Sequence, residues 1–205
     1  DNYIVEVEPD GMYEIHIPNS LRKIGLCAFS NASVVHTETV TRKLLIACTQ
    51  GGNKQTYHAA RFWRLKVKDK PELILPKTID LLAIQEINDF VNTDGGEMPH
   101  LYKYGGRVYG GYGNAALAAA LEHCRLHPDK QVKTFLTQHA AKIADVYADE
   151  AEELVKYIQA GVFSDTALKK MMTELEANKK GRDDLAVIKG YLLNAIKPQK
   201  SNFCL

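Results

Sequence analysis

The run RFWRLKVK, residues 61–68, has side chains whose types and spacing suit a phosphate backbone. Successive side chains of a β-strand point to opposite faces, so the run separates into two sets. One set is an aromatic residue followed by three cations: Phe62, Arg64, Lys66 and Lys68. The cations recur about every 7 Å, twice the rise per residue, and an aromatic ring can stack a base. We expect these cations to be exposed and Trp63, on the other face, to be buried.

Three further cations would widen this basic surface. Lys54 lies in the turn expected before the run, and Arg42 and Lys43 lie on the strand expected to pair with it. A solvated strand face, whose lysines keep a sheet edge from aggregating, is the alternative for the same pattern. Runs of charge are common on exposed faces, so the pattern leaves both interpretations open.

The glycine-rich stretch YKYGGRVYGGYG, residues 102–113, comes directly before a helix expected to begin at Asn114. The free N–H groups of a helix start and its positive dipole end attract anions. Cations and stacking aromatics accompany the glycines: Lys103, Arg107, Tyr109 and Tyr112. The stretch lacks the Lys-Ser/Thr ending of a P-loop and follows no convincing buried strand. A loop that only reverses the chain is the alternative.

Catalytic and metal-binding patterns are weak in this sequence. His123 and His127 share a helix face, but Pro128 follows directly and no third ligand is near. Interaction with free helix-end carbonyls is the simpler interpretation. The dense carboxylates of residues 145–153 are typical of a solvated helix surface, and no nucleophile stands beside a base. The sequence favours a protein without catalytic residues, metal or cofactor.

Strands are expected in the first third of the chain. Residues 3–17 alternate apolar and polar side chains around Pro9-Asp10-Gly11, which predicts a β-hairpin. Residues 32–48 and 56–68 flank a glycine-containing turn and predict a second hairpin. The segment PELILP, residues 71–76, predicts a short edge strand or an extended linker.

Helices are expected after residue 77. The apolar spacing predicts helices over residues 78–92 and from Asn114 to about residue 126. Asp129 is expected to cap a helix that either continues to residue 160 or breaks near residues 147–153. Two more helices are expected, one beginning at Ser164 or Asp165 and one over residues 185–196.

Strands first and helices later indicate an α+β protein. We expect N-terminal antiparallel β-hairpins over about residues 1–76, followed by a bundle of about five helices. The corresponding division is a basic β-rich subdomain, residues 1–76, and a helical subdomain, residues 77–205, with the glycine-rich loop at residues 102–113.

Charge is unevenly distributed along the chain. Residues 20–78 contain eleven Lys or Arg and three Asp or Glu, a net charge of +8. The whole chain has a formal charge of +1, so the remainder totals −7. This excludes a uniformly polycationic protein and indicates a basic face on one part of the molecule.

Cysteine spacing and hydropathy indicate the cellular compartment in which the protein is expected. Cys27, Cys48, Cys124 and Cys204 are scattered without a CxxC pair, which favours free thiols in a reducing compartment. A disulfide is the alternative. The sequence contains neither a signal-peptide pattern nor an apolar run of membrane-spanning length. We therefore expect a cytoplasmic protein without membrane contact.

These features favour a non-catalytic protein that binds single-stranded nucleic acid, RNA before DNA, with little sequence selectivity. A self-assembling structural or coat subunit is the first alternative, because basic and acidic faces of one chain favour a homo-oligomer. The second alternative is an enzyme whose phosphorylated substrate lies at the helix start formed by Gly113 and Asn114.

Overall fold

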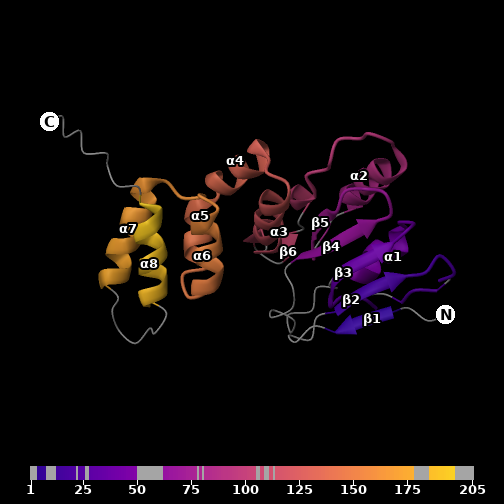
Figure 1. The fold of residues 1–205 in the computed structure, drawn as a ribbon, viewed down its shortest axis with the longest axis horizontal. Helices are drawn as coiled ribbons and strands as arrows, with labels where there is room; N and C mark the ends of the chain where they lie inside the picture. Colours follow the sequence, from indigo (N-terminus) through magenta and orange to yellow (C-terminus); the bar gives the residue numbers. More distant parts are fainter. Residues whose placement is uncertain are drawn as a thin grey trace. The chain divides into compact units, whose positions relative to one another are not determined.

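The computed structural model describes most of the chain: residues 4–7, 13–21, 23–25, 28–49, 62–77, 79, 81–104, 107–108, 111–112, 114–177 and 185–196. The chain separates into two compact units, residues 1–123 and 124–205. The first contains the β-sheet and the second contains helices (Figure 1). The five-stranded sheet ends at residue 76 and a helix begins at residue 81, near the predicted change from strands to helices, and the first unit itself continues to residue 123.

Five strands of the described part of the chain form one mixed sheet, ordered β1-β2-β3-β4-β5. The strands are β1 (Ile4–Val7), β2 (Tyr13–Ile17), β3 (Ala32–Thr37), β4 (Phe62–Val67) and β5 (Leu73–Pro76). The β1–β2 and β4–β5 pairs are antiparallel, whereas β2–β3 and β3–β4 are parallel. The α+β class is confirmed, but the sheet is mixed and is not the expected series of antiparallel hairpins; of the two expected hairpins, only the strands within residues 3–17 pair in antiparallel fashion.

Helix α1 (Arg42–Cys48) explains why the second hairpin prediction is wrong. The Oγ1 atom of Thr41 accepts a hydrogen bond of 3.2 Å from the N–H of Leu44, which caps this helix. Parallel strands need a crossover connection rather than a tight turn, and α1 belongs to the crossover between β3 and β4. Arg42 and Lys43 therefore begin a helix and do not lie on a strand. Residues 50–55 of the expected turn lie outside the described residues.

The core of the first unit lies on one face of the sheet. Trp63 and Leu65 of β4 are fully buried, and they share a hydrophobic cluster with residues of α1 and of α2 (Leu81–Asn92). Arg64 and Lys66 are partly exposed between these buried neighbours. The predicted alternation, with Trp63 inside and the cations on the opposite face, is confirmed.

Strand β5 lies at one end of the sheet order, and all of its residues are buried. Of the two alternatives for this segment, the edge strand is the one observed. The short 3-10 helix η1 (Leu101–Tyr104) lies against β5. Beyond η1, β6 (Arg107–Val108) and β7 (Gly111–Tyr112) pair in antiparallel fashion, and α3 (Asn114–Leu126) begins at the expected Asn114.

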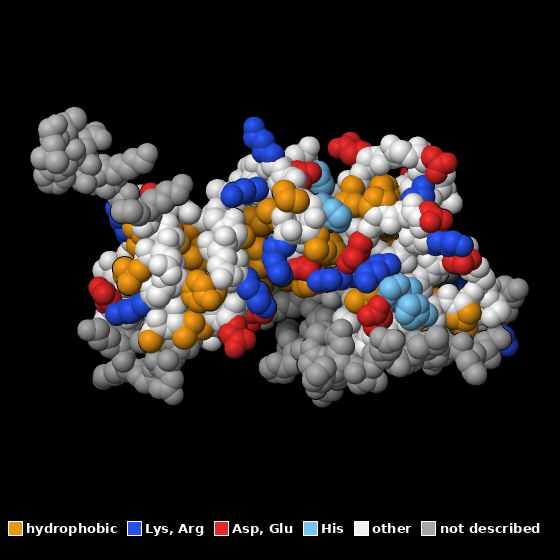
Figure 2. All heavy atoms as spheres, in the orientation of Figure 1, with side chains coloured by type: hydrophobic (Ala, Val, Ile, Leu, Met, Phe, Trp, Pro, Cys, Tyr) orange, Lys and Arg blue, Asp and Glu red, His pale blue; other side chains and the backbone are white. Residues whose placement is uncertain are grey.

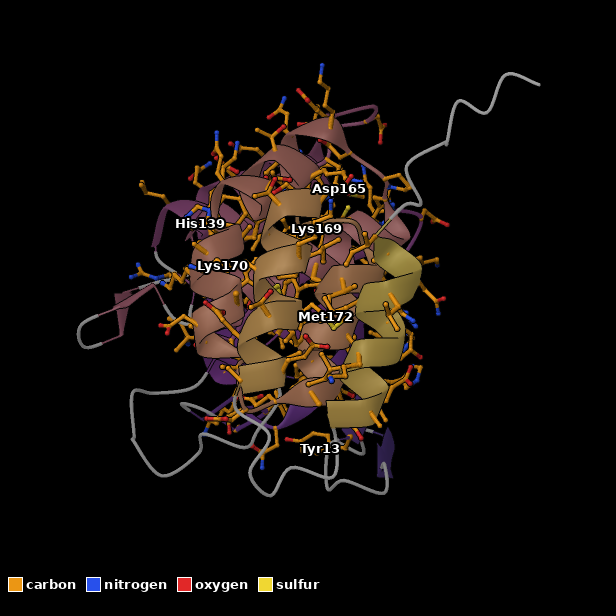
Figure 3. All side chains as sticks on the ribbon, turned by 90° about the vertical axis from the view of Figure 1, so that its left-hand side faces the viewer. Tyr13, His139, Asp165, Lys169, Lys170 and Met172 are labelled. Atoms are coloured by element: carbon orange, nitrogen blue, oxygen red, sulfur yellow. The ribbon has the colours of Figure 1, made fainter. Side chains whose placement is uncertain are left out.

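The second unit is helical in its described residues. Its helices are α4 (Lys130–Gln138), α5 (Ala140–Val146), α6 (Ala151–Gln159), α7 (Asp165–Ala177) and α8 (Leu185–Ala195). Figure 3 looks onto α7, along which Asp165, Lys169 and Met172 follow one another, with α8 beside it. The expected helix break after residue 146 is present, since α5 ends at Val146 and α6 begins at Ala151. The helix is also interrupted at His139, between α4 and α5, where the Nδ1 atom of His139 lies 2.8 Å from the carbonyl oxygen of Phe135.

The expected cap at Asp129 is confirmed, because its carboxylate accepts a hydrogen bond of 2.6 Å from the N–H of Gln131. Cys48 and Cys124 are free thiols, while Cys27 and Cys204 lie outside the described residues. Among the helices that the structure describes, none combines the length and the apolar composition that a membrane crossing requires.

Candidate functional site

The candidate site lies where the parallel strands β2, β3 and β4 end. His16 is paired with His36 on β3, and His36 is paired with Lys66 on β4, so these three residues form one row across the sheet. The carboxyl ends of parallel strands meet at one edge, and ligands of open sheets that contain parallel strands bind preferentially there. We call the hollow at this position the carboxyl-edge groove.

The carboxyl-edge groove has a volume of about 350 Å³. Its polar lining comes from all three parallel strands and the residues directly after them: His16, His36, Thr37, Glu38, Lys66 and Lys68. Figure 2 shows histidine side chains beside basic and acidic ones over the strands of the first unit. The groove therefore offers ammonium donors, imidazole nitrogens and the carboxylate of Glu38 within one small volume.

Two histidines and a glutamate form the centre of the site. The imidazole rings of His16 and His36 are stacked, with centroids 4.0 Å apart and planes 11° from parallel. The Nε2 atom of His36 also contacts the Oε1 atom of Glu14. This hydrogen bond, followed by the charges of His36, Lys66 and His16, lowers the pKa of the Glu14 carboxyl below its ordinary value against the opposing effect of burial.

The two lysines of the groove differ in their surroundings. Lys68 is well exposed, and its ammonium lies 3.6 Å from the carboxylate of the exposed Glu38. Exposed pairs of this kind contribute at most about 1 kcal/mol, so an external anion can replace Glu38 at little cost. Lys66 is partly exposed, and its positive charge is one of the causes that lower the pKa of Glu14.

Arg64 has a different position from that expected for an exposed cation. Its guanidinium pairs with the carboxylate of Glu122 on α3, and its Nε atom lies 3.5 Å from the carboxylate of Glu72. The Glu122 side chain is only 6 % exposed, whereas that of Arg64 is 34 % exposed. The structure thus brings Lys66 and Lys68 to the groove and directs Arg64 toward the protein's own carboxylates.

The other cations and aromatics predicted for the basic surface are more widely distributed. Arg42 and Lys43 are exposed in the first turn of α1, five and six residues after the end of β3. Phe62 is partly buried at the start of β4, opposite Pro76 of β5. Lys54 lies outside the described residues.

The structure describes the glycine-rich loop only in part. Lys103 is exposed in η1, whereas the side chains of Arg107 and Tyr112 and the whole of Tyr109 lie outside the described residues. An anion site at the start of α3 stays a prediction. His123 is 3 % exposed, and its ring lies 5.7 Å from that of His100 and 6.2 Å from that of Tyr102. Within the described residues, His123 is thus part of a buried aromatic cluster.

A second cavity, of about 530 Å³, lies in the helical unit between α5, α6 and α7. Its wall consists mainly of alanines and other apolar residues, with charged side chains such as Asp145 and Lys170 among them. The part of this wall that the structure describes contains no histidine or cysteine. The first unit therefore holds the stronger candidate site.

Sequence reasoning missed Glu14, His16 and His36 as site residues. A partial signal was present, because alternation in the strand YEIHI places Glu14 and His16 on one face. Their neighbour His36 could not be found in this way, since its pairing with His16 depends on a parallel β2–β3 contact that the predicted hairpins excluded.

Comparison of the chain with protein-family models, with curated proteins and with solved structures finds no match. The residues of the carboxyl-edge groove therefore carry the functional inference.

Proposed function

We propose that the carboxyl-edge groove binds single-stranded nucleic acid, without catalysis and with little sequence preference. The observation that supports this most directly is the joint position of Lys66 and Lys68 on one wall of the groove, beside the stacked histidines. Cations that neutralise phosphates release counterions, which supplies sequence-independent affinity. A groove that combines such cations with flat rings is typical of single-strand binding surfaces.

The lysines would contact successive phosphates of the bound strand. Lys66 lies on β4 and Lys68 directly follows the end of this strand, and two residues of extended chain span about 7 Å. The pair between Lys68 and Glu38 is exposed and separated by 3.6 Å, so a phosphate competes with Glu38 in high dielectric. Arg42 and Lys43 follow the end of β3 closely and would extend the charged surface beyond the groove.

The rings would contact bases. His16 is exposed, and its ring is already stacked on that of His36, so a base placed on its outer face would continue an existing stack. Phe62 lies four residues before Lys66 on the same strand face, about 13 Å away along the strand. A base one or two nucleotides further along would reach Phe62. Arg64 is assigned a positioning role between these contacts, because it already pairs with Glu122 and Glu72.

Fluorescence polarisation with labelled single-stranded RNA and DNA oligonucleotides of mixed sequence tests the proposal across a salt series. We expect the double variant Lys66→Glu/Lys68→Glu to bind at least tenfold more weakly than the wild type. Replacing these lysines by alanine should reduce the slope of log K against log salt by about one for each phosphate that a lysine no longer neutralises.

A matched control is available on α7. The double variant Lys169→Glu/Lys170→Glu makes the same change in net charge on the second unit, where both lysines are exposed (Figure 3). It should retain most of the wild-type affinity. Equal losses in the two double variants would show a general charge effect and overturn the assignment to the groove, as would unchanged affinity in the groove variant.

Light scattering on the same proteins separates nucleic-acid binding from self-assembly. Without oligonucleotide, we expect the wild type and the groove variant Lys66→Glu/Lys68→Glu to have the same mass in solution. If the groove variant lowers the mass and leaves oligonucleotide affinity unchanged, the groove is a self-association surface and the proposal is wrong.

A further inference from the structure

We infer that Glu14, His16 and His36 bind a divalent transition-metal ion, with zinc as the expected one. This inference goes beyond nucleic-acid binding and does not depend on it, because it concerns the ligand atoms of three side chains. Among the residues that the structure describes, these three form a group whose potential ligand atoms all lie within 4.8 Å of one another.

The backbone brings the three side chains to one place. Glu14 and His16 are two residues apart on β2, so they point to the same face of the sheet. His36 is the direct partner of His16 on the parallel strand β3. The register between these strands shifts at Tyr13 and Glu14, an irregularity of the kind that redirects side chains next to binding sites.

The ligand atoms need only small movements to coordinate an ion. Ligands about 2.0–2.2 Å from a tetrahedral zinc ion lie roughly 3.3–3.5 Å from one another. The limit of 4.8 Å between the present atoms exceeds this by about 1.3–1.5 Å. The Nε2 atom of His36 and the Oε1 atom of Glu14 are already in contact. We expect rotation of these side chains, of which Glu14 and His36 are each 27 % exposed, to close the remaining difference.

The ligand set selects the class of metal. Two imidazole nitrogens and one carboxylate oxygen suit zinc and neighbouring transition metals, whereas magnesium and calcium prefer sites made entirely of oxygen atoms. Lys66, the strand neighbour of His36, has a positive charge that offsets the charge of Glu14. The net charge around the three ligands therefore attracts cations only weakly, and binding of the metal ion depends on its coordinate bonds to the imidazole nitrogens.

The position of the group leaves room for an exchangeable ligand. His36 and Glu14 are each 27 % exposed, and His16 and His36 line the carboxyl-edge groove. Three protein ligands leave the fourth tetrahedral position to water or to an anion from the groove, unlike a structural zinc site with four protein ligands. We therefore expect reversible zinc binding, with one ion for each chain.

Isothermal titration calorimetry with Zn²⁺ on the purified chain, without oligonucleotide, tests the inference. We expect one zinc ion bound for each chain and no binding of Mg²⁺. His36→Ala and Glu14→Gln should each weaken zinc binding by roughly 100-fold, since loss of even an outer partner of a metal ligand costs about 10–100-fold. Lys66→Ala should strengthen binding, because it removes a nearby positive charge.

Histidines and thiols elsewhere in the chain require their own controls. His139→Gln changes a histidine of the second unit that lies far along the chain from the three ligands (Figure 3), and it should leave zinc affinity unchanged. Replacing Zn²⁺ by Co²⁺ should give the visible absorption spectrum of a tetrahedral cobalt site, without absorption from thiolate-to-cobalt charge transfer. Circular dichroism of each variant establishes that the fold is retained.

Unchanged zinc affinity in a folded His16→Ala/His36→Ala variant would overturn the inference, as would a thiolate signature in the cobalt spectrum. This result is distinguishable from failure of the proposed function, because the titration contains no nucleic acid. The polarisation assay is in turn carried out with chelator present, so a negative result there leaves the metal site unaffected.

Discussion

The guanidinium of Arg64 on β4 pairs with the carboxylate of Glu122 on α3. Glu122 is almost completely buried, and Arg64 also approaches Glu72 within 3.5 Å. The ion pair thus joins the polar face of the sheet to the helix that ends the first unit. An arginine whose strand position suggested full exposure instead connects two elements of the fold.

Arg64→Ala should therefore destabilise the first unit. We expect the free energy of unfolding to fall by about 2 kcal/mol, because Glu122 loses its charged partner in a poorly hydrated position. Urea unfolding followed by the fluorescence of Trp63 measures this, since the chain contains one tryptophan. Lys66→Ala on the same strand face is the control and should change the free energy by less than about 0.5 kcal/mol. Equal stabilities of the two variants would contradict a structural role for Arg64.

Trp63→Ala should unfold or severely weaken the first unit. The Trp63 side chain is completely buried among residues of the sheet, α1 and α2. Its removal should cost about 3–5 kcal/mol, the range for large aromatic residues in cores. Thermal unfolding followed by circular dichroism provides the measurement. Phe62→Ala removes the adjacent, partly exposed aromatic and should cost clearly less; a similar loss in both variants would contradict the alternation of faces along β4.

Lys77 makes the stability depend on pH. Its ammonium is buried, donates hydrogen bonds to the carbonyl oxygens of Ala32 and Cys48, and has a pKa that burial lowers to about 8. The ordinary value of 10.5 applies in the unfolded chain. The unfolded state consequently binds more protons between about pH 8 and pH 10.5, so this residue makes stability rise with pH in that window. Across this window, the titration of Lys77 raises the free energy of unfolding by a total on the order of 3 kcal/mol.

Cys48 acts in the opposite direction. Burial raises the pKa of its thiol to about 12, from an ordinary value of 9.0. Above about pH 9 the unfolded state releases this proton and the folded state keeps it, so stability falls as pH rises. We expect a net rise confined to about pH 8–9 in the wild type, and a rise that continues to about pH 10.5 in Cys48→Ala. Urea unfolding at a series of pH values should show no rise from this source in Lys77→Met, and an unchanged slope in that variant would contradict the assignment.

Asp129→Ala should destabilise the second unit alone. The Asp129 carboxylate accepts hydrogen bonds from the N–H groups of Gln131 and Val132 at the start of α4. Loss of such a cap costs about 1 kcal/mol. Hydrogen exchange should show faster exchange in α4, with the sheet unaffected. Lys130→Ala, at the next position, retains the cap and should leave this exchange close to that of the wild type.

The local features of this fold were predictable from the sequence, and the pairing of strands was not. Alternation around Trp63 and the cap at Asp129 follow from short-range rules, and both are confirmed. The segment around Leu44 was predicted as a strand because its apolar run suits either structure. The cap at Thr41 favours the helix, and this one difference converts an expected hairpin into a parallel crossover.

The candidate site depended on that same difference. Lys66 and Lys68 could be assigned to an exposed face from β4 alone, and the structure places both in the groove. The row of His16, His36 and Lys66 requires three strands in parallel register, and no local pattern encodes such a register. The ion-pair partner of Arg64 was equally unpredictable from the sequence, because Glu122 is 58 residues away along the chain.

That separation has a consequence for synthesis of the protein. When Arg64 is synthesised, the carboxylate of Glu122 has not yet been made, and the chain must grow by 58 further residues before the ion pair can form. Since a domain generally folds as a unit and the first unit ends at residue 123, the pair between Arg64 and Glu122 can form only when nearly the whole unit has been synthesised.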